Sequence, residues 1–452
     1  MGAGSAPRFG TDGVRGVAYT ELSTEFVRTL GRAVARVIGS PVVLVGRDTR
    51  ASSPELAAAV GQGLALEGVR AVSVGVLPTP ALAWLAASEG AAAVMVTASH
   101  NPYTDNGVKV FAAGGTKLTD GTESAIESEL ERLGVGASDG VRSSAALAET
   151  AVELPGAVER YAQHFVDLFG VHALEGMHLV VDCAHGAMSQ VAPDVLRRLG
   201  ARLTVIGAEP DGTNINAGCG ATHPGRLLET VRSLGADAGL AFDGDGDRVI
   251  AATARTGIID GDRILAVIAP WLRETGSLAG DALAVTVMSN LGLRRAMDEA
   301  GIRVVETAVG DRYVLEALER EQLCLGGEQS GHIILRHLAT TGDGLLAGIV
   351  LLTAARSRNR SLDEVAGAAM SSFPQVLVNV RIDRPDPSVV AGIAPEIAAV
   401  ASELGDSGRV LVRPSGTEPV VRVMVEAADS ATAERSAQRL ADAIARRLSG
   451  QS

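Results

Sequence analysis

Short runs of β-branched and other apolar residues alternate with helix-length segments along most of the chain, and this alternation restricts the fold more than any other feature. Early in the chain, the runs at residues 42–45, 71–76 and 91–96 have the length and composition of buried strands, with helices expected between them. A helix between two strands brings the chain back to the end of the sheet at which the first strand began, so the two strands run parallel. The sequence therefore predicts an α/β fold with mixed, mostly parallel sheets that helices cover.

The alternation recurs, and it divides the 452 residues into four segments. A chain of this length exceeds what a single hydrophobic core usually supports. We predict three consecutive α/β domains at residues 1–153, 154–255 and 256–366, followed by a smaller α+β domain at residues 367–452. Ligands of open α/β sheets bind beyond the carboxyl ends of the strands, so we expect the four domains to surround a central cleft.

Composition excludes several classes of function. A hydrophobic content of 46% with 21% charged residues is typical of a globular protein, not of a disordered one. The formal net charge of −13 argues against nucleic acid or an anionic membrane as a partner. The longest apolar stretch, residues 344–355, is too short to cross a bilayer. The start shows no secretory signal and the 3 cysteines form no disulfide framework, so we expect a cytoplasmic protein.

A candidate nucleophile follows the strand expected at residues 91–96. The next residues read TASHNP, in which small polar residues and a proline end regular structure. The hydroxyl of Ser99 would lie at the carboxyl end of a buried strand, where it could act as a nucleophile or carry a covalent group. The alternative is a turn between a strand and a helix in which the serine is only a cap.

Lysine is almost absent from the chain, and its two occurrences lie close together. Of 40 lysines and arginines, only Lys109 and Lys117 are lysines, and both follow Ser99. Lysine, unlike arginine, loses its proton near neutral pH when its surroundings lower its pKa. We therefore predict a proton-transfer role for Lys109, with chance clustering as the alternative.

Three carboxylates at alternating positions follow the strand expected at residues 238–242, in the segment DGDGDR. Asp243, Asp245 and Asp247 would repel one another unless a cation binds them, and oxygen ligands of this kind suit Mg²⁺. A calcium loop of the EF-hand type is excluded, because Arg248 stands where glycine is needed and Ala254 where a bidentate glutamate is needed. A solvated acidic turn is the alternative. Arg248 could bind a phosphate through both ends of its guanidinium.

The segment GGEQSGH at residues 326–332 is a glycine-rich loop with three polar side chains at every second position. Glu328 and Ser330 could hydrogen-bond hydroxyls or an amino group of a ligand, and His332 could move a proton. The alternative is a connecting loop whose histidine is structural.

The segment RPSGTEP at residues 413–419 follows the last strand but one. Arg413, Ser415, Gly416 and Thr417 offer a guanidinium, two hydroxyls and an unhindered backbone N–H, which together could bind a phosphate. Arg422, on the returning strand, could add a second guanidinium. The alternative is an ordinary hairpin turn.

Together these loops resemble the active-site loops of the α-D-phosphohexomutases. The segments TASHNPYTDNGVK, DGDGDR, GGEQSGH and RPSGTEP occur in the order of that family, and the resemblance extends from FGTDGVRG at residues 9–16 into the C-terminal segment. The third and fourth loops are more similar to the branch that acts on amino-sugar phosphates than to the phosphomannomutase/phosphoglucomutase branch, which typically has asparagine where Gly416 stands.

The resemblance implies an isomerase that moves a phosphoryl group between the 6- and 1-positions of glucosamine phosphate. Ser99 would carry the group as a phosphoserine and, with the three aspartates of the second loop, would hold Mg²⁺. Arg15 would add positive charge, and Lys109 and His332 would be general base and acid in an unassigned order. Arg248, together with the polar side chains of the third and fourth loops, would bind the substrate.

The resemblance also implies partners and leaves alternatives open. A sugar 1,6-bisphosphate would be an intermediate or activator, and a kinase or bisphosphate donor would first load Ser99. The partner is a small phosphosugar, and a homodimer is expected as the assembly. The alternatives are a phosphomannomutase/phosphoglucomutase of the same superfamily and a non-catalytic anion-binding protein with the same fold.

Overall fold

The computed structural model describes residues 7–10, 12–134, 152–382, 387–415 and 419–449. The chain forms two compact units. The first consists of Met1–Met288 and Gly301–Ala369, and the second of Ser289–Ala300 and Met370–Ser452. The second unit therefore takes one short segment from the middle of the chain.

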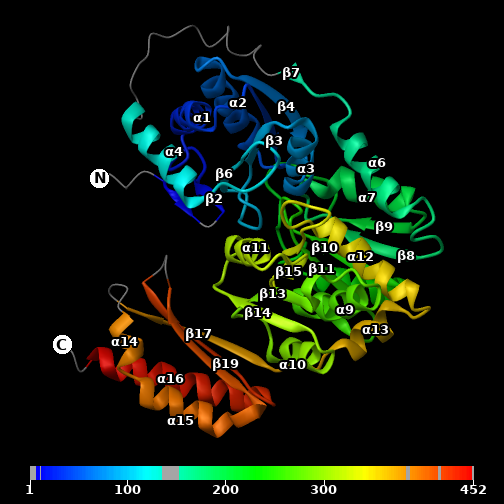
Figure 1. The fold of residues 1–452 in the computed structure, drawn as a ribbon, viewed down its shortest axis with the longest axis vertical. Helices are drawn as coiled ribbons and strands as arrows, with labels where there is room; N and C mark the ends of the chain where they lie inside the picture. The colour runs from blue at the N-terminus through cyan, green and yellow to red at the C-terminus, as the bar shows by residue number, and fades with distance from the viewer. Residues whose placement is uncertain (1–6, 11, 135–151, 383–386, 416–418, 450–452) are drawn as a thin grey trace. The chain divides into compact units, whose positions relative to one another are not determined.

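Three sheets of the first unit share one arrangement of four strands (Figure 1). In each, a first strand is followed by a helix and a parallel second strand on one side. A second helix then leads to a parallel third strand on the other side of the first, and a fourth strand returns antiparallel beside the third. The order of strands in every sheet is therefore fourth, third, first, second. The chain first winds to one side of the first strand and then to the other, so the winding direction changes beside that strand.

The first sheet has seven strands. In the order in which they pair, they are β1 (Phe9–Gly10), β2 (Gly13–Val17), β6 (Asp105–Phe111), β5 (Ala92–Val96), β3 (Val42–Arg47), β4 (Arg70–Val76) and β7 (Val152–Glu153). The predicted strands at residues 42–45, 71–76 and 91–96 are confirmed as β3, β4 and β5. Strand β6 was not predicted, because Asp105, Asn106 and Lys109 make its sequence polar although its side chains are nearly all buried.

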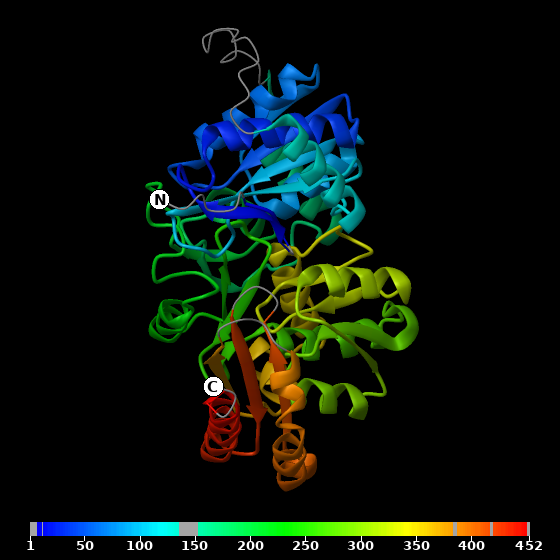
Figure 2. The ribbon, with the colours of Figure 1, turned by 90° about the vertical axis from the view of Figure 1, so that its left-hand side faces the viewer.

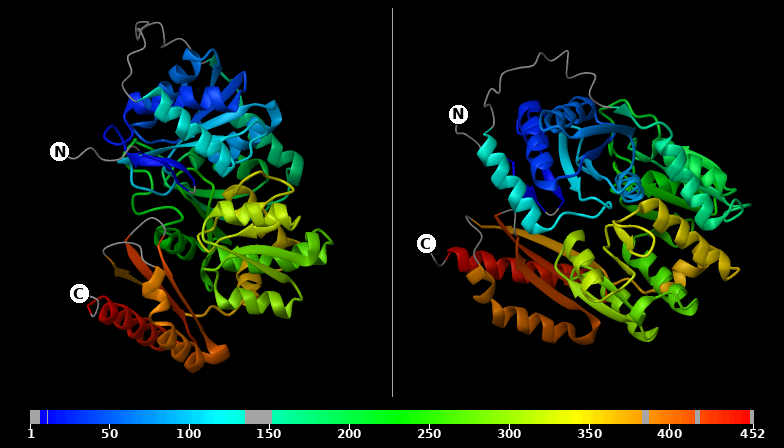
Figure 3. Two further views of the ribbon diagram at one scale, coloured as in Figure 1. Left: turned by 60° about the vertical axis from the view of Figure 1, so that its left-hand side comes forward. Right: turned by 45° about the horizontal axis from the view of Figure 1, so that its top comes forward.

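Helices cover both faces of the first sheet (Figures 1 and 3). The helices on one face are α1 (Thr24–Ile38), α2 (Ser53–Leu66) and α4 (Asp120–Leu133), and α3 (Thr79–Glu89) lies on the other. Alternate residues of the central strands, such as Val43 and Val45 of β3 and Val94 and Val96 of β5, point into one core with Leu56 of α2. Because the side chains of β5 alternate between the two faces of the sheet and are buried on both, packing holds β5 and its carboxyl end in place.

The second and third sheets repeat the arrangement with fewer strands. The second pairs β12 (Gly257–Ile259), β11 (Val249–Thr253), β10 (Ala238–Phe242), β8 (His178–Asp182) and β9 (Arg202–Ile206). The third pairs β14 (Arg303–Thr307), β13 (Ala282–Thr286), β15 (Leu325–Gly327) and β16 (Ile333–Leu335). Strand β12 lies beyond the predicted boundary at residue 255, so the second sheet ends a few residues later than expected.

The helices of this part of the chain are α6 (Ala157–Phe169), α7 (Met188–Arg198), α8 (Gly225–Leu234), α9 (Gly261–Glu274), η1 (Ala279–Asp281), α11 (Asp311–Arg320), α12 (Gly344–Ser357) and α13 (Leu362–Ala369). Among them, α7, α8 and α11 are crossovers between parallel strands, and the others precede or follow the sheets. None of the helices formed by the described residues combines the length and apolar character that crossing a bilayer requires.

In each repeat, the connection between the third and fourth strands carries one of the predicted motifs. Ser99 lies between β5 and β6, the three aspartates lie between β10 and β11, and Glu328 to His332 lie between β15 and β16. The carboxyl end of a parallel strand beside a change of winding direction is where α/β sheets bind ligands. Three copies of one topology therefore present three different chemical groups at equivalent places.

The second unit is a smaller α+β structure. Its antiparallel sheet pairs β17 (Gln375–Arg381), β19 (Val420–Glu426) and β18 (Arg409–Pro414). Its helices are α10 (Leu291–Glu299), α14 (Pro387–Ala391), α15 (Ala394–Leu404), η2 (Gly405–Ser407) and α16 (Ser430–Ser449), and α15 and α16 lie on one face of the sheet (Figure 2). Helices α14 and α15 are separated at Gly392 and Ile393, and a proline in the first turn of α15 lacks the N–H that would continue a helix from α14.

The contact between α1 and α2 depends on glycine. A methyl group at Gly63 would overlap the carbonyl oxygen of Arg28 in α1, whereas one at Gly61 of the same helix would lie 3.6 Å from the Ala71 Cβ. We expect Gly63→Ala to lower the free energy of unfolding by about 1–3 kcal/mol, because the two helices must separate. We expect Gly61→Ala to leave it unchanged or raise it by up to about 1 kcal/mol, because alanine favours the helix. Urea denaturation of the two variants measures both, and equal stabilities would contradict the close-contact explanation.

Candidate active site

Ser99 is almost fully buried at the turn after β5, and its backbone adopts an unusual conformation. Its φ of 51° lies in the left-handed region, which costs a residue with a Cβ about 1–3 kcal/mol unless the surroundings impose it. The hydroxyl donates a hydrogen bond of 2.7 Å to Asp243 Oδ2 and lies 3.2 Å from His100 Nδ1. The turn therefore points the Ser99 hydroxyl toward the acidic loop of the second repeat.

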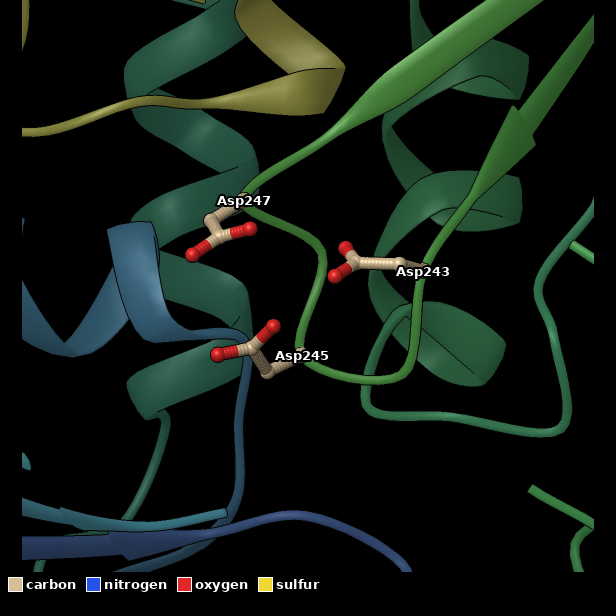
Figure 4. A group of neighbouring side chains, drawn as sticks. All are labelled: Asp243, Asp245 and Asp247. Carbon is tan, nitrogen blue, oxygen red and sulfur yellow. The ribbon is translucent and has the colours of Figure 1, made fainter. Parts of the chain in front are cut away.

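The three aspartates of that loop point toward one another (Figure 4). Asp243, Asp245 and Asp247 are buried, and one carboxylate oxygen of each lies within 4.8 Å of one oxygen of the others. Two unit charges at this distance repel by about 3–4 kcal/mol at an effective dielectric constant near 20. Burial, together with the charges of Asp247 and Asp245, raises the pKa of Asp243 to about 8.

The carboxylate oxygens of this group have spare capacity to bind a cation. Among the described residues, Oδ1 of Asp245 and Oδ1 of Asp247 are buried without a hydrogen bond, although His332 Nδ1 lies 3.6 Å from the latter. Buried acceptors of this kind are expensive unless something satisfies them. The residues therefore fit a hard divalent metal ion, which would take exactly such oxygen-only ligands from three carboxylates.

Lys109 projects from β6 into the same group of carboxylates. Its ammonium lies 2.7 Å from Asp12 Oδ2, 2.8 Å from Asp245 Oδ2 and 3.2 Å from Asp247 Oδ2. Burial alone would lower the pKa of Lys109, but the three carboxylates outweigh it and hold the pKa well above its usual value. The prediction that the surroundings lower this pKa is therefore wrong. A compact ammonium with three donors fits among three carboxylates where a planar guanidinium would not, which gives lysine a reason other than proton loss.

Six buried or nearly buried groups of alternating charge form a closed circuit, here called the charge ring. In order they are Asp12, Lys109, Asp247, His332, Asp311 and Lys117, which returns to Asp12. The members come from all three repeats, and both lysines of the chain belong to it. Burial would lower the pKa of His332, but Asp247 and Asp311 outweigh it and raise that pKa.

His100, whose Nδ1 lies 3.2 Å from the Ser99 hydroxyl, is influenced by two arginines. Burial and the positive charges of Arg248 and Arg15 lower the pKa of His100 to about 4, so its imidazole is neutral at neutral pH. Arg15 donates to Asp12 Oδ2 at 2.9 Å, and the backbone N–H of Arg248 donates to Asp243 Oδ1 at 3.2 Å. Arginines from two repeats therefore act on His100, the residue that follows the candidate nucleophile.

The third loop lies next to the acidic loop. The backbone of His332 pairs with that of Arg248 in a β-bridge, and Glu328 Oε1 accepts a hydrogen bond of 3.2 Å from Gly310 N. Arg248 and Ser330 line a pocket of about 360 Å³. This volume falls within the range of small-molecule sites, about 300–1,000 Å³.

The fourth loop belongs to the second unit. Arg413 of β18 pairs directly with Arg422 of β19, and burial and the charge of Arg422 lower the pKa of Arg413. Ser415 is buried, and Gly416 and Thr417 lie outside the described residues. Two guanidiniums at paired positions of neighbouring strands repel each other. An anion bound between them would relieve this repulsion, so the pair favours anion binding.

Four family models match successive parts of the chain. Their descriptions are phosphoglucomutase/phosphomannomutase alpha/beta/alpha domain I at residues 6–134, domain II at 159–257, domain III at 260–373 and the C-terminal domain at 377–443. The chain belongs to the phosphoglucomutase/phosphomannomutase family. The predicted α-D-phosphohexomutase fold, with three α/β domains and a smaller C-terminal domain, is confirmed, and the residue numbers of the predicted boundaries stay a proposal.

Curated relatives in this family are phosphoglucosamine mutases. The chain is 49% identical to that of Leifsonia xyli subsp. xyli over 98% of its own length and 99% of the relative. It is 49% identical to that of Mycobacterium tuberculosis over 96% of its own length and 98% of the relative. The predicted amino-sugar branch of the family is confirmed by these relatives, and the chain is an enzyme, an isomerase that transfers a phosphoryl group within its substrate.

Solved structures of the family have the same fold. A phosphoglucomutase/phosphomannomutase family protein from Burkholderia thailandensis is 25% identical, with a TM-score of 0.76 over 96% of both chains. An N-acetylphosphoglucosamine mutase from Aspergillus fumigatus, solved with GlcNAc-6P and magnesium, is 19% identical, with a TM-score of 0.69 over 98% of this chain and 96% of that one.

Several residues of this phosphohexomutase site were not found from the sequence. Asp12, Asp311 and His100 contact Lys109, His332 and Ser99 in the structure. Asp12 and His100 lie inside segments already singled out, FGTDGVRG and TASHNP, so their motifs could have drawn attention to them. Asp311 begins α11 and carries no local signal, because its partners His332 and Lys117 are distant in sequence and Lys117 belongs to another repeat.

The acidic loop of the mutase should bind Mg²⁺, and Asp245→Asn should weaken that binding about tenfold or more, because one charged ligand is lost. Calorimetric titration of the metal-free protein with MgCl₂ measures the affinity. Asp182→Asn is the matched control, because Asp182 is equally buried at the end of the neighbouring strand β8 and bonds only backbone N–H groups of Ala184 and Gly220 in the described structure.

The same titration should depend on pH in one direction. A proton on Asp243 competes with the metal, and the pKa of Asp243 is raised to about 8. The apparent affinity should therefore rise as the pH is raised through about 8 and then level off, with up to about one proton released per ion near neutral pH. Equal affinities below and above this pH, or an Asp245→Asn variant that binds as tightly as the wild type, would contradict the metal assignment.

Proposed function

We propose that this enzyme interconverts glucosamine 6-phosphate and glucosamine 1-phosphate by transferring a phosphoryl group to and from Ser99. The observation that supports this most directly is the 2.7 Å hydrogen bond from the Ser99 hydroxyl to Asp243, within a buried group of three carboxylates. The 49% identity to phosphoglucosamine mutases over nearly the whole chain supports the choice of an amino sugar.

In the proposed reaction, the resting enzyme carries a phosphoryl group on Ser99 Oγ. The free hydroxyl of the bound sugar phosphate attacks phosphorus, the bond from phosphorus to Ser99 Oγ breaks, and a 1,6-bisphosphate results. The sugar then turns over, its other phosphoryl group returns to Ser99 Oγ, and the isomeric monophosphate leaves. Each transfer moves one proton off the attacking hydroxyl and one onto the departing oxygen. Such reactions depend mainly on positioning and on neutralising the phosphoryl oxygens.

Positive charge for this neutralisation comes from several groups. We propose that Asp243, Asp245, Asp247 and an oxygen of the phosphorylated Ser99 hold Mg²⁺, which would withdraw charge from the phosphoryl oxygens. The magnesium in the Aspergillus fumigatus structure supports the choice of this ion. Arg15 and Arg248 act from the protein side, because the pKa of His100, next to Ser99, is lowered by both.

We propose that Lys109 and His332 manage the protons. Both lie in the charge ring beside the acidic loop, Lys109 at Asp245 and Asp247 and His332 at Asp247. Lys109 holds its proton in the structure, which suits donation to a departing oxygen. His332 lies between two carboxylates, Asp247 and Asp311, which hold its ring in place, so it can pass a proton to or from an oxygen in the site and is restored when the second transfer reverses the first. We leave open which of the two groups acts as acid and which as base.

The substrate is proposed to bind through both ends. Arg248 and Ser330, which line the 360 Å³ pocket, would contact the sugar, and we propose that Glu328 of the same loop as Ser330 binds the amino group. The fourth loop, with Arg413, Ser415, Gly416, Thr417 and Arg422, would bind the phosphate that is not being transferred.

Further proposals follow from the resemblance. A sugar 1,6-bisphosphate is proposed as the intermediate and as an activator, supported by the glucose 1,6-bisphosphate in a related Aspergillus fumigatus structure. A kinase or bisphosphate donor for the first loading of Ser99 and a homodimer stay predictions. We place the enzyme in the cytoplasm, supported by the free thiols of Cys183, Cys219 and Cys324.

Ser99→Ala should abolish turnover, because it removes the oxygen that carries the phosphoryl group. The fold should be kept, because the loss of one oxygen atom leaves only a small cavity. The measurement is formation of glucosamine 1-phosphate from the 6-phosphate with Mg²⁺ and glucose 1,6-bisphosphate, together with intact-mass analysis. Ser88→Ala, an exposed serine of the same domain whose hydroxyl bonds only its own helix among the described residues, is the control and should keep full activity.

Two outcomes would refute the proposed function. Wild-type protein that carries no phosphate on Ser99 and isomerises nothing even with added bisphosphate would indicate a non-catalytic anion-binding protein. A higher kcat/KM on glucose 6-phosphate or mannose 6-phosphate than on glucosamine 6-phosphate would favour the phosphomannomutase/phosphoglucomutase alternative.

Lys109→Arg keeps the positive charge but should lower kcat about 100-fold or more, because a guanidinium does not fit among carboxylate oxygens at 2.7–3.2 Å. Lys109→Met, which removes the charge, should lower kcat at least as much. Both variants should still bind Mg²⁺, because the ammonium competes with the ion for Asp245 and Asp247. Steady-state kinetics and magnesium titration measure the two effects, and an unchanged kcat for Lys109→Arg would remove Lys109 from the reaction.

A further inference from the structure

Arg50 is the largest fully buried side chain of the described structure, and it lies beneath the turn that carries Ser99. Its five N–H groups all have acceptors, four of which are backbone carbonyls of that turn. The acceptors are Asp48 Oδ2 at 2.8 Å, Ser99 O at 2.9 Å, Asn101 O at 2.8 Å, Asp105 O at 3.1 Å and Pro102 O. One guanidinium therefore satisfies almost the whole inner side of the turn between β5 and β6.

Asp48 holds Arg50 from the other side. It follows β3, the strand beside β5, so both carboxyl ends meet at one edge of the sheet. Its Oδ1 accepts hydrogen bonds from Ser53 Oγ at 2.6 Å and from the backbone N–H of Arg50 at 3.0 Å. Its Oδ2 accepts one from Thr97 Oγ1 at 2.7 Å. The carboxylate is thereby fully occupied by groups on three different segments, which fixes its position.

Thr97 connects this network to the backbone of Ser99. Its hydroxyl donates to Asp48 and accepts the Ser99 N–H at 2.9 Å. The N–H and the C=O of Ser99 are thus bound by Thr97 and Arg50, on either side of the residue whose φ is 51°. A left-handed conformation at a residue with a Cβ persists only where its surroundings impose it.

The second repeat also approaches this turn. Asn216 Nδ2 donates to the Ser99 carbonyl at 2.9 Å, and a Cβ at Gly244 would lie 2.5 Å from the same oxygen. The acidic loop is therefore in direct contact with the Ser99 backbone, and a shift of the turn would move the hydroxyl relative to Asp243.

We propose that Asp48, Arg50 and Thr97, here called the Arg50 clamp, are positioning residues that set the direction of the Ser99 hydroxyl and of the phosphoryl group it carries. This inference rests on the proposed function of Ser99. The phosphoryl group must be given to one end of the sugar and taken back from the other, so its carrier has to stay in place through both transfers. A displacement of about 1 Å is enough to slow such a step about 100-fold.

The most selective test compares two substitutions of Thr97. Thr97→Ser keeps the hydroxyl, and Thr97→Val keeps the shape but removes the bonds to Asp48 and to the Ser99 N–H. We expect Thr97→Ser to retain kcat within about threefold and Thr97→Val to lose about 10- to 100-fold in kcat, with KM for glucosamine 6-phosphate changed less than about threefold. Hydrogen exchange of the amides of residues 98–107 should speed up in Thr97→Val alone.

Arg50→Lys provides the second variant, because lysine keeps the charge but offers three donors in place of five. Arg32→Lys is its control, a mostly buried arginine of the same domain that pairs with Glu67 at 2.7 Å, and it should keep wild-type kinetics. The ³¹P NMR resonance of the enzyme-bound phosphate should shift or broaden in Arg50→Lys and in Thr97→Val. If Arg50→Lys does not fold, the Thr97 pair decides the question.

The outcomes separate this proposal from the proposed function. If wild-type Ser99 takes up phosphate, but folded Thr97→Val matches Thr97→Ser in kcat and in its phosphorus resonance, the clamp is only structural and the inference is overturned. If wild-type Ser99 takes up no phosphate from glucose 1,6-bisphosphate, the proposed function fails, whatever the exchange rates of the variants. Slowed turnover with an altered phosphorus resonance and unchanged KM supports the clamp.

Discussion

Buried charge has to be paired, and the site of this enzyme is built around that constraint. Three carboxylates lie together in the acidic loop, and removing such groups from water is unfavourable by several kcal/mol each unless counter-charges replace the lost hydration. The charge ring supplies part of the compensation through Lys109 and His332, and a metal ion would supply the rest. Because Asp12 and Lys109 come from the first repeat, Asp247 from the second and His332 from the third, the charges are neutralised only when all three repeats are packed together. The complete charge ring therefore requires residues from all three repeats of the first unit.

The repeated topology explains how one kind of sheet carries three kinds of chemistry. In each repeat, the functional loop joins the third parallel strand to an antiparallel fourth strand, at the edge where the winding direction changes. The strand topology at this place is the same in the three sheets, and the side chains differ: a hydroxyl at Ser99, carboxylates after β10, and Glu328 to His332 after β15. The first repeat adds a device of its own. Arg50 binds four carbonyl groups of its loop, and the chain can therefore keep Ser99 in a strained conformation without help from a ligand.

Predictions from the sequence were most accurate where the signal was local. The strand expected at residues 238–242 agrees with β10 to the residue, and those expected at 71–76 and 91–96 agree with β4 and β5 within one residue, because each is an apolar pattern bounded by turn residues. Strand β6 was missed because its buried residues include Asn106 and Lys109, whose partners lie elsewhere in the chain. The scarcity of lysine correctly indicated that Lys109 lies in the site, but the pKa of Lys109 is raised there and not lowered. Composition shows that Lys109 is special, but its pKa depends on three carboxylates, one of which is about 100 positions away in sequence and two about 140.

By itself, the sequence determined the α/β class, the candidate carrier Ser99 and the candidate metal ligands Asp243, Asp245 and Asp247. A strand that ends in a polar loop is encoded within about ten consecutive residues, and so is a run of alternating carboxylates. Only the tertiary structure decided that Ser99 bonds Asp243, that Lys109 keeps its proton, that Asp311 faces His332 and that Arg50 supports the carrier turn. The physical reason is that hydrogen bonds and charge interactions depend on distance in space. The partners are distant in sequence: Asp243 meets Ser99 from another repeat, whereas Asp311 and Arg50 reach their partners within one repeat.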